Sequence, residues 1–313
     1  FRKEFDLLRG TKVATAPDVL FLPSGHLNIP AGIRTLSNGL FREEAEKALE
    51  ANSYHSGFYF TPSVRNDSLY AMKDAKNPQS SSTFQGLTNT VSLFIEIRGI
   101  GLGRACFARR AECGFLVSRS LLETAALHSK EVRSEIRKAV KETCSGKSDI
   151  SVTFQCARTE LPVTFIDLAK NERFTEPLPT FDALQLKAEL VRKRPKAYIL
   201  PNTCRMQAEK LRALGIEVEE IGKTFTATVE KYIVTGYKKV TKEWEKIYPV
   251  TVSTRTVKEK KSFPAGCFII RLSQKNANLA TTLLEPESVN GFVNFEVVHT
   301  EFGKELPIYR KGF

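Results

Sequence analysis

The sequence predicts an α/β fold over its first part and a β-rich region after it. Before Cys144, short apolar strands alternate with segments of helical periodicity. Beyond the polar stretch Cys144–Ser148, apolar residues instead recur with a period of two along several segments. The chain has 313 residues, which is enough for two domains of ordinary size. We therefore expect domains at residues 1–145 and 146–313.

The first predicted elements follow one another closely. Asp18–Pro23 is an apolar run typical of a short strand, and Pro30 begins a helix that continues to about Ser53. Phe58–Thr61 predicts another strand. The polar residues of 62–85 predict a long loop, and loops of that length in a compact domain are commonly functional.

The segment Thr90–Ser120 is the one around which we expect the first domain to be organised. Alternation of apolar side chains over 91–97 predicts a buried central strand. Glycines at 99, 101 and 103 follow it, and a helix is predicted over 104–126 that continues toward Lys141. One carboxylate, Glu96, therefore lies near the carboxyl end of the strand, where open α/β sheets bind ligands.

A carboxylate within an apolar strand is costly to bury unless it is paired or its ionisation is used. Three interpretations of Glu96 stay open on spacing alone. It can form a structural ion pair with Arg98 or Arg104, it can point outward from a less buried sheet, or it can be a functional acid or base.

The sequence matches two nucleotide-binding motifs only in part. The strand, glycines and helix around Glu96 are nearly a dinucleotide-binding turn, but the helix continues to Lys141 and leaves no second strand with an acid about 20 residues beyond. Gly146-Lys147-Ser148 lacks the upstream glycine of a phosphate-binding loop, because Lys141 occupies that position.

The second region predicts a β-rich domain with one helix. Its helix is expected at Thr203–Leu214, ended by Gly215, after a strand at 196–201. The other predicted strands are 150–157, 161–168, 225–234, 248–257, 266–272 and 291–298. These segments contain no constellation of catalytic residues, so we expect the domain to support the first one or to recognise a surface.

Composition excludes several classes of protein. With 42% hydrophobic and 26% charged residues, the chain is typical of a globular protein, and no apolar run approaches the roughly 18 residues of a membrane helix. The net charge of +12 suggests nucleic acid, but the basic residues are dispersed and no nucleic-acid-binding motif accompanies them. Solvated faces or an acidic surface partner fit this dispersion better.

The six cysteines show no Cys-x-x-Cys spacing, which argues against a zinc ribbon or a redox motif. Cys106 and Cys113 share a face of the predicted helix about two turns apart, roughly 10 Å by helix rise, too far for a mutual disulfide. We expect both to be core thiols.

The segment around Glu96 resembles the end of the catalytic domain in zinc metallocarboxypeptidases of the carboxypeptidase A type. The matching residues are Phe94, Ile95, Glu96, Ile97, Arg98, Gly99, Gly101, Leu102, Gly103, Arg104, Phe107, Arg109 and Arg110. Asp18–Leu36, Phe263–Phe295 and Glu305–Arg310 resemble other parts of the same proteins. The resemblance implies the C-terminal part of a mixed-sheet carboxypeptidase-like domain, followed by a β-rich accessory domain.

The resemblance also implies an activity, namely hydrolysis of the C-terminal peptide bond of a peptide substrate. Glu96 takes the family's general-base position, accepting a proton from the zinc-bound water. Arg98 and Arg104 are candidates to orient Glu96 or to bind anionic substrate groups. Tyr70 and the stretch Gln79–Gln85 are candidate walls of the substrate pocket. Such proteins are often exported, which implies a secreted or periplasmic location.

The family's zinc ligands are not found where the resemblance requires them. A His-x-x-Glu pair and a later His should precede Glu96, yet neither His26 nor His55 has an acid three residues on. His128 and Glu131 have the spacing, but they follow Glu96 and are typical of a solvated helix face. We therefore expect no metal ligand in this sequence.

Two hypotheses explain the missing ligands. The chain, which begins at Phe1 without Met, can be a fragment whose zinc ligands lie in a preceding N-terminal portion of the same protein. Alternatively, it is a catalytically inactive scaffold of carboxypeptidase fold that binds peptides or a surface. The sequence leaves both open, together with the number of copies that assemble.

Overall fold

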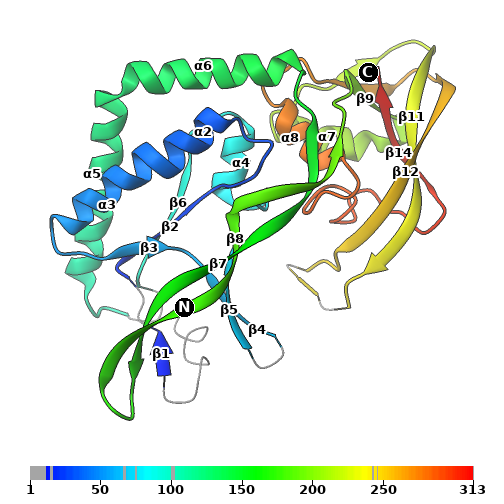
Figure 1. Cartoon of the computed structure of the whole chain (residues 1–313). Coiled ribbons are helices and arrows are strands. Elements are labelled where there is room, and N and C mark those ends of the chain that lie inside the picture. Colours follow the sequence, from blue (N-terminus) through cyan, green and yellow to red (C-terminus); the bar gives the residue numbers. More distant parts are fainter. Residues whose placement is uncertain are drawn as a thin grey trace.

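The structure is a computed structural model that contains three β-sheets and several helices (Figure 1). This mixture confirms the predicted α/β class. It describes residues 12–14, 17–65, 68–74, 76–99, 103–241, 243–244 and 246–312. Within these ranges, no helix is both long and apolar enough to span a membrane.

A small mixed sheet carries the segment around Glu96. Strand β2 (Val19–Pro23) lies in its middle, parallel to β3 (Ser56–Phe58) and antiparallel to β6 (Leu93–Ile97). All five residues of β2 are buried, as its apolar sequence predicts. The prediction of a buried central strand at 91–97 is wrong in two respects. β6 is only partly buried, and among the described strands it lies at the end of its sheet.

Helices cover one face of this sheet. The predicted helix after Pro30 is present as a continuous helical run with a π-helical stretch in its middle. It consists of α2 (Ala31–Thr35), η1 (Leu36–Phe41) and α3 (Arg42–Glu50). The core between helices and sheet contains Val19, Phe21, Ala45, Leu49, Cys113 and Val117. The last two residues belong to α5 (Phe107–Leu127), so α3 and α5 bury the same face of β2.

The predicted helix from 104 to 141 is two helices. A break at His128 separates α5 from α6 (Ser129–Ser145), and the chain changes direction there (Figure 1). Cys113 is buried as expected, but Cys106 precedes α5 and is exposed, so the prediction of a core thiol is wrong for Cys106. All six cysteines are free thiols.

A long two-stranded ribbon crosses beneath the small sheet. Its strands, β7 (Ile150–Asp167) and β8 (Glu172–Arg192), pair antiparallel along their length (Figure 1). β7 joins the two predicted strands 150–157 and 161–168 into one. The ribbon forms a five-stranded sheet in the order β1-β7-β8-β5-β4, in which β1 is Lys12–Ala14.

The predicted long loop at 62–85 is wrong, because most of it is regular structure. It contains most of β4 (Thr61–Arg65), β5 (Ser68–Lys73) and α4 (Ser81–Leu87). β5 pairs with β8 and buries Leu69 and Ala71 in a small core below the ribbon. Two buried apolar side chains within a polar segment are a weak sequence signal for a strand. The segment becomes a strand because it pairs with β8, which lies far along the chain. The predicted strand Phe58–Thr61 is divided between β3 and β4.

The third sheet is antiparallel and has the order β10-β13-β9-β14-β11-β12. Four of its strands are predicted from the sequence, if not over their full lengths. The strands are β9 (Ala197–Leu200), β10 (Glu219–Ile221), β11 (Phe225–Lys239), β12 (Val250–Phe263), β13 (Cys267–Arg271) and β14 (Glu305–Lys311).

The β-rich region contains more helix than predicted. After the 3₁₀ turn η2 (Asn202–Cys204), helix α7 (Arg205–Ala213) is followed by Gly215 with a φ of +77°, which confirms the predicted helix end. Helix α8 (Ala277–Leu284) is not predicted, because it is buried on every side and lacks amphipathic periodicity. The predicted strand 291–298 is wrong, since the chain forms turns there.

The largest core combines both sequence regions. Ile33, Leu87 and Ala139 pack in one buried cluster with side chains of the third sheet and of α8, including Tyr198 and Leu284. The two-domain division at 145/146 stays a prediction, and the hydrophobic core is continuous across it.

Candidate active site around Glu96

Glu96 lies one residue before the end of β6 and pairs with Leu20 of β2. Side chains alternate across the strand. Leu93 and Ile95 pack into the helix-covered core, whereas Phe94 packs with Leu22 of β2 toward the ribbon. Alternation therefore places Glu96 on the ribbon side of the sheet.

The ribbon side of the small sheet is apolar near Glu96. Leu22 packs with Ala183 and Leu184 of β8, and the Tyr59 ring meets the Phe94 ring edge-to-face with centroids 6.0 Å apart. Glu96 is itself half-buried on this side. Glu96 thus lies on a strand with apolar neighbours and is itself only partly buried.

Arg98 and Arg104, the two partners that spacing allowed for Glu96, are both exposed. Arg98 follows β6 directly, its backbone N–H donates to the Asp18 carbonyl at 2.9 Å, and its side chain is exposed. Arg104 is exposed in the turn before α5. Neither guanidinium forms an ion pair with a described residue, so both can contact a ligand.

A different ion pair, which the sequence analysis missed, fixes the start of α5 to the sheet. Arg109 donates from Nε and Nη2 to the two carboxylate oxygens of Asp18 at 2.7 and 2.8 Å. These hydrogen bonds hold the pKa of the buried Asp18 carboxyl below its usual value, helped by the backbone N–H of His55. The Arg109 guanidinium also lies over the Tyr54 ring at 4.7 Å. Arg109 is part of the resembled motif, but only the fold reveals its partner.

Tyr70 lies in a different sheet from Glu96. It belongs to β5, is half-buried, and its ring meets Phe181 of β8 edge-to-face at 5.7 Å. The Arg158 guanidinium covers the Phe181 ring at 3.5 Å. The structure does not bring Tyr70 and Glu96 together in one sheet, and the role of Tyr70 as a pocket wall stays a prediction.

Residues of the stretch Gln79–Gln85 do line a cavity, of about 410 Å³. Pro78, Gln79 and Phe84 line it from one side, and its other walls come from α7 and α8 and the turns after them. These walls are Lys210, Ala213, Leu214, Leu279, Leu283, Asn290, Gly291, Phe292, Phe295 and Val297. The cavity is mostly apolar and contains no residue of β6.

The described ranges contain no group of three His, Cys, Asp or Glu side chains that could hold a metal ion. His128 and Glu131 are both exposed, with the ring Nδ1 3.2 Å from the carboxylate, which confirms the solvated helix face. His26 is fully buried, and its Nδ1 accepts the Asn28 N–H at 3.2 Å. Burial and the charge of Arg34 lower the pKa of His26 to about 3. The residues present therefore do not fit a zinc site.

The known proteins that this chain resembles in sequence include several fungal proteins named carboxypeptidase 2 or probable carboxypeptidase 2. The chain is 29% identical over 296 residues to carboxypeptidase 2 of Trichophyton equinum, and 28% identical over 296 residues to that of Trichophyton tonsurans. It is 29% identical over 274 residues to probable carboxypeptidase 2 of Arthroderma benhamiae. The first two matches cover 94% of this chain.

These matches support a carboxypeptidase family. The chain spans about half the length of the curated carboxypeptidases it matches, 55% in the case of Trichophyton equinum. No family model and no solved structure matches the chain.

A second buried carboxylate, Glu285, was not found by sequence reasoning. It follows α8, is fully buried, and accepts hydrogen bonds from the hydroxyls of Tyr198 and Tyr232 and from Arg192. Burial and the neighbouring Glu285 charge raise the pKa values of both tyrosines well above the usual value. Arg310 is an additional cation, with Nε 3.5 Å from Oε1 of Glu285. Being closed to solvent, this cluster is suited to stability rather than to catalysis.

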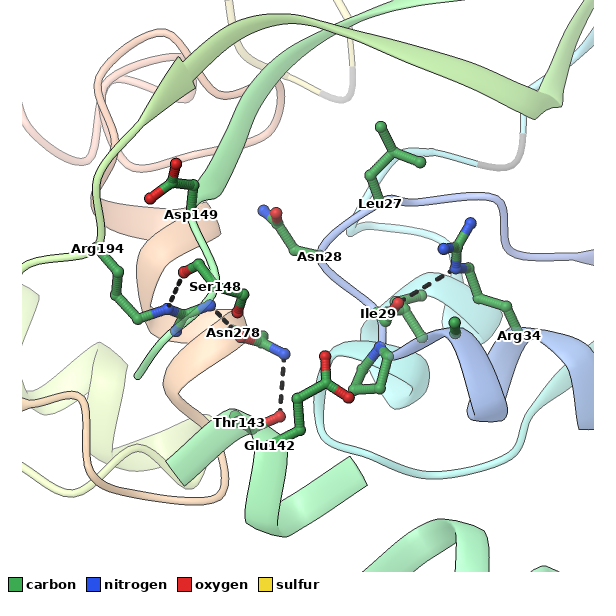
Figure 2. A pocket seen from close by; sticks show the side chains of 12 residues that line it. Leu27, Asn28, Ile29, Arg34, Glu142, Thr143, Ser148, Asp149, Arg194 and Asn278 are labelled. Atoms are coloured by element: carbon green, nitrogen blue, oxygen red, sulfur yellow. Dashed lines mark hydrogen bonds between the residues drawn. The ribbon is translucent and has the colours of Figure 1, made fainter. Parts of the chain in front are cut away.

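A cavity of about 150 Å³ lies where α2, α6 and the base of the ribbon meet (Figure 2). Arg194 donates from Nε to the Ser148 carbonyl at 3.1 Å and from Nη2 to Asn278 at 2.6 Å. Asn278 in turn donates to Thr143 at 3.1 Å. Nη1 of Arg194 is closed to solvent and lacks a partner among the described residues. These bonds connect α6, α8 and the ribbon, so the cavity is best explained as a structural junction.

Proposed function

We propose that the chain contributes the general base, Glu96, to a carboxypeptidase that hydrolyses the C-terminal bond of peptides. The observation that carries the proposal is the half-buried Glu96 near the end of β6, in a chain whose relatives are named carboxypeptidase 2. A strand fixes the carboxylate more rigidly than a loop would, which suits a group that must meet a reacting proton within hydrogen-bond reach.

The reaction requires one proton to move twice. The Glu96 carboxylate accepts a proton from water as the water oxygen bonds to the scissile carbonyl carbon. The protonated carboxyl then gives that proton to the leaving amine as the C–N bond breaks. The products are a shortened peptide and a free amino acid, and Glu96 returns to its ionised state.

Arg98 and Arg104 supply the remaining polar chemistry in this proposal. A carboxypeptidase substrate carries a carboxylate at the end that is cleaved, and guanidinium groups bind carboxylates through paired hydrogen bonds. Both arginines are exposed and have no described ion-pair partner. Tyr70 is proposed as a wall of the substrate pocket, contributed from β5.

Zinc dependence is also part of the proposal, although the described residues do not supply the ligands. When bound, zinc would supply a more acidic water and polarise the substrate carbonyl. Its ligands are expected from polypeptide outside this sequence, a proposed partner of this chain. A secreted or periplasmic location is proposed on the same resemblance.

The test uses the native protein that contains this chain. We expect it to release the last residue of an N-blocked dipeptide with a free C-terminus, and to leave the matched C-terminal amide intact. A strong zinc chelator should abolish the release, and added zinc should restore it. Absence of release would refute the peptidase activity, whereas release that is insensitive to chelation would refute only the metal dependence.

A further inference from the structure

Helix α5 has two uncharged faces, only one of which is covered by described residues. Cys113, Val117, Ser120 and Thr124 are buried against the sheet and α3. At 100° per residue, a second arc of about 120° contains no charged side chain. This arc consists of Phe107, Ala108, Ala111, Gly114, Phe115, Ser118, Leu122, Ala125 and Ala126.

The second arc is open to solvent. The exposed fractions of Phe107, Phe115 and Leu122 are 68%, 61% and 73%. The neighbouring helix α6 shows what a solvated face of this protein looks like. Its exposed positions include Lys130, Glu131, Arg133, Arg137, Lys138, Lys141 and Glu142. A helix that is apolar on two sides is typical of one buried from two sides, so α5 is suited to a second partner.

Among the described residues, the strand beside α5 has an open edge. The Arg98 N–H bonds to Asp18, next to β2, so in the antiparallel alternation the N–H and C=O groups of Ile95 and Ile97 point away from β2. Of the described strands, only β2 pairs with β6. Proteins protect such edges with charges, prolines or covering elements, whereas β6 contains no proline and a single charged residue, Glu96.

The open edge and the uncharged arc form one surface. A Cβ placed on Gly114 of α5 would lie 3.2 Å from Cδ1 of Ile97, so the Ile97 side chain packs closely against the helix at Gly114. Arg110 donates to the carbonyls of Gly99 and Gly103 at 3.2 and 2.7 Å, fixing the turn between the two elements. We define the α5–β6 surface as Ile95, Ile97, Phe107, Ala111, Phe115, Ser118 and Leu122.

We propose that the α5–β6 surface docks the polypeptide that corresponds to the unmatched part of the carboxypeptidase 2 relatives. That part is large, because 296 aligned residues make up only 55% of the Trichophyton equinum protein. The partner adds a strand to the edge of β6 and an apolar element over the arc of α5. This inference rests on the proposed function, and it places the partner beside the strand that holds Glu96.

Site-specific photocrosslinking tests the docking in the native protein that contains this chain. Benzoylphenylalanine at position 115 should crosslink to peptides that align with the unmatched part of carboxypeptidase 2. The same probe at Lys138, on the exposed charged face of α6, is the control and should give few crosslinks. Crosslinks from position 115 to a second copy of this chain would overturn the proposal, as would a yield no higher than at position 138.

Hydrogen exchange provides a second measurement that needs no enzymatic activity. The amides of Ile95 and Ile97 should exchange at least about 100-fold more slowly in the native assembly than in this chain alone. Equal exchange in both would overturn the added strand. Because neither measurement uses a substrate, docking without peptidase activity would refute the proposed function alone, and activity without docking would refute this inference alone.

Discussion

Glu285 and Glu96 are both carboxylates placed beside apolar strands, but their surroundings differ. Glu285 is fully buried, and its oxygens receive two tyrosine hydroxyls and Arg192, with Arg310 close by. Glu96 is only partly buried, at the end of a strand whose outer edge is open among the described residues. Two exposed arginines, Arg98 and Arg104, follow it in the chain.

The difference separates a structural carboxylate from a candidate catalytic one. Glu285 accepts the buried hydroxyls of Tyr198 and Tyr232 and pairs with Arg192, so removing its carboxylate leaves both hydroxyls without that acceptor and takes one counter-charge from a buried arginine. Glu96 is only partly buried, so we expect its loss to affect chemistry more than folding. Four measurements test this distinction between structural and functional ionisable groups.

The largest expected effect is on activity, from Glu96→Gln in the native protein. The amide cannot accept the proton from water, so kcat should fall by roughly 10²- to 10⁴-fold with KM little changed. Steady-state kinetics on a blocked dipeptide measures the change. Glu123→Gln, the same substitution on the exposed side of α5, should retain full activity. A Glu96→Gln protein that keeps its kcat would remove Glu96 from the mechanism.

The opposite result is expected for Glu285→Ala, which should lower the free energy of unfolding by about 3–5 kcal/mol. The buried hydroxyls of Tyr198 and Tyr232 would lose their acceptor, while Arg192 would keep its ion pair with Glu287. Urea unfolding followed by circular dichroism measures the loss. The exposed Glu301 provides the control, since Glu301→Ala should change the free energy by less than about 0.5 kcal/mol. Equal effects of the two substitutions would show that the cluster does not stabilise the fold.

The sequence alone marks Glu96 as a candidate site residue but does not mark Glu285, and the reason is physical. A single acid that interrupts a short apolar strand is visible locally, whatever the rest of the fold. The partners of Glu285 come from four strands, at Arg192, Tyr198, Tyr232 and Arg310. The third sheet brings three of these strands together, and Arg192 comes from β8 of the five-stranded sheet, so no short spacing in the sequence records the cluster.

The same reasoning explains which elements of the fold were predictable. The strand Val19–Pro23 and helix α7 carry their own periodicity and end signals, and both were predicted. Helix α8 lacks periodicity because every residue is buried, and β5 becomes a strand through pairing with β8, which lies far along the chain. The break between α5 and α6 at His128 also lacks a proline or glycine to mark it.

His26 sharpens the comparison, because it is a buried ionisable group without a counter-ion among the described residues. Its pKa is about 3 in the fold, from burial and the charge of Arg34, against about 6.5 unfolded. As the pH falls, the unfolded chain therefore binds a proton at His26 before the folded protein does. The contribution of His26 to the free energy of unfolding is fully present above about pH 6.5 and is lost as the pH drops toward 3.

Protonation of His26 in the unfolded chain should lower the free energy of unfolding by about 2 kcal/mol at pH 5 relative to pH 7. Urea unfolding at both pH values should show this loss in the wild-type protein, and His26→Gln should be nearly free of it. If the two proteins lose stability equally between pH 7 and 5, other groups carry the pH dependence and His26 is not held neutral by the fold.

The smallest effect is expected at Asp18, whose partner Arg109 is half-exposed and hence screened by solvent. The pKa of Asp18 is lowered in the fold, so its ion pair stabilises above the unfolded pKa of about 3.9 and is lost as the pH falls through the lowered value. The stability difference between the wild type and Asp18→Asn should therefore be constant from about pH 7 to 5 and shrink below about pH 4. High salt should reduce it, because the guanidinium is accessible to ions. A difference that grows on acidification would mean that Asp18 is stabilised as the neutral acid, like a buried carboxyl and unlike a paired one.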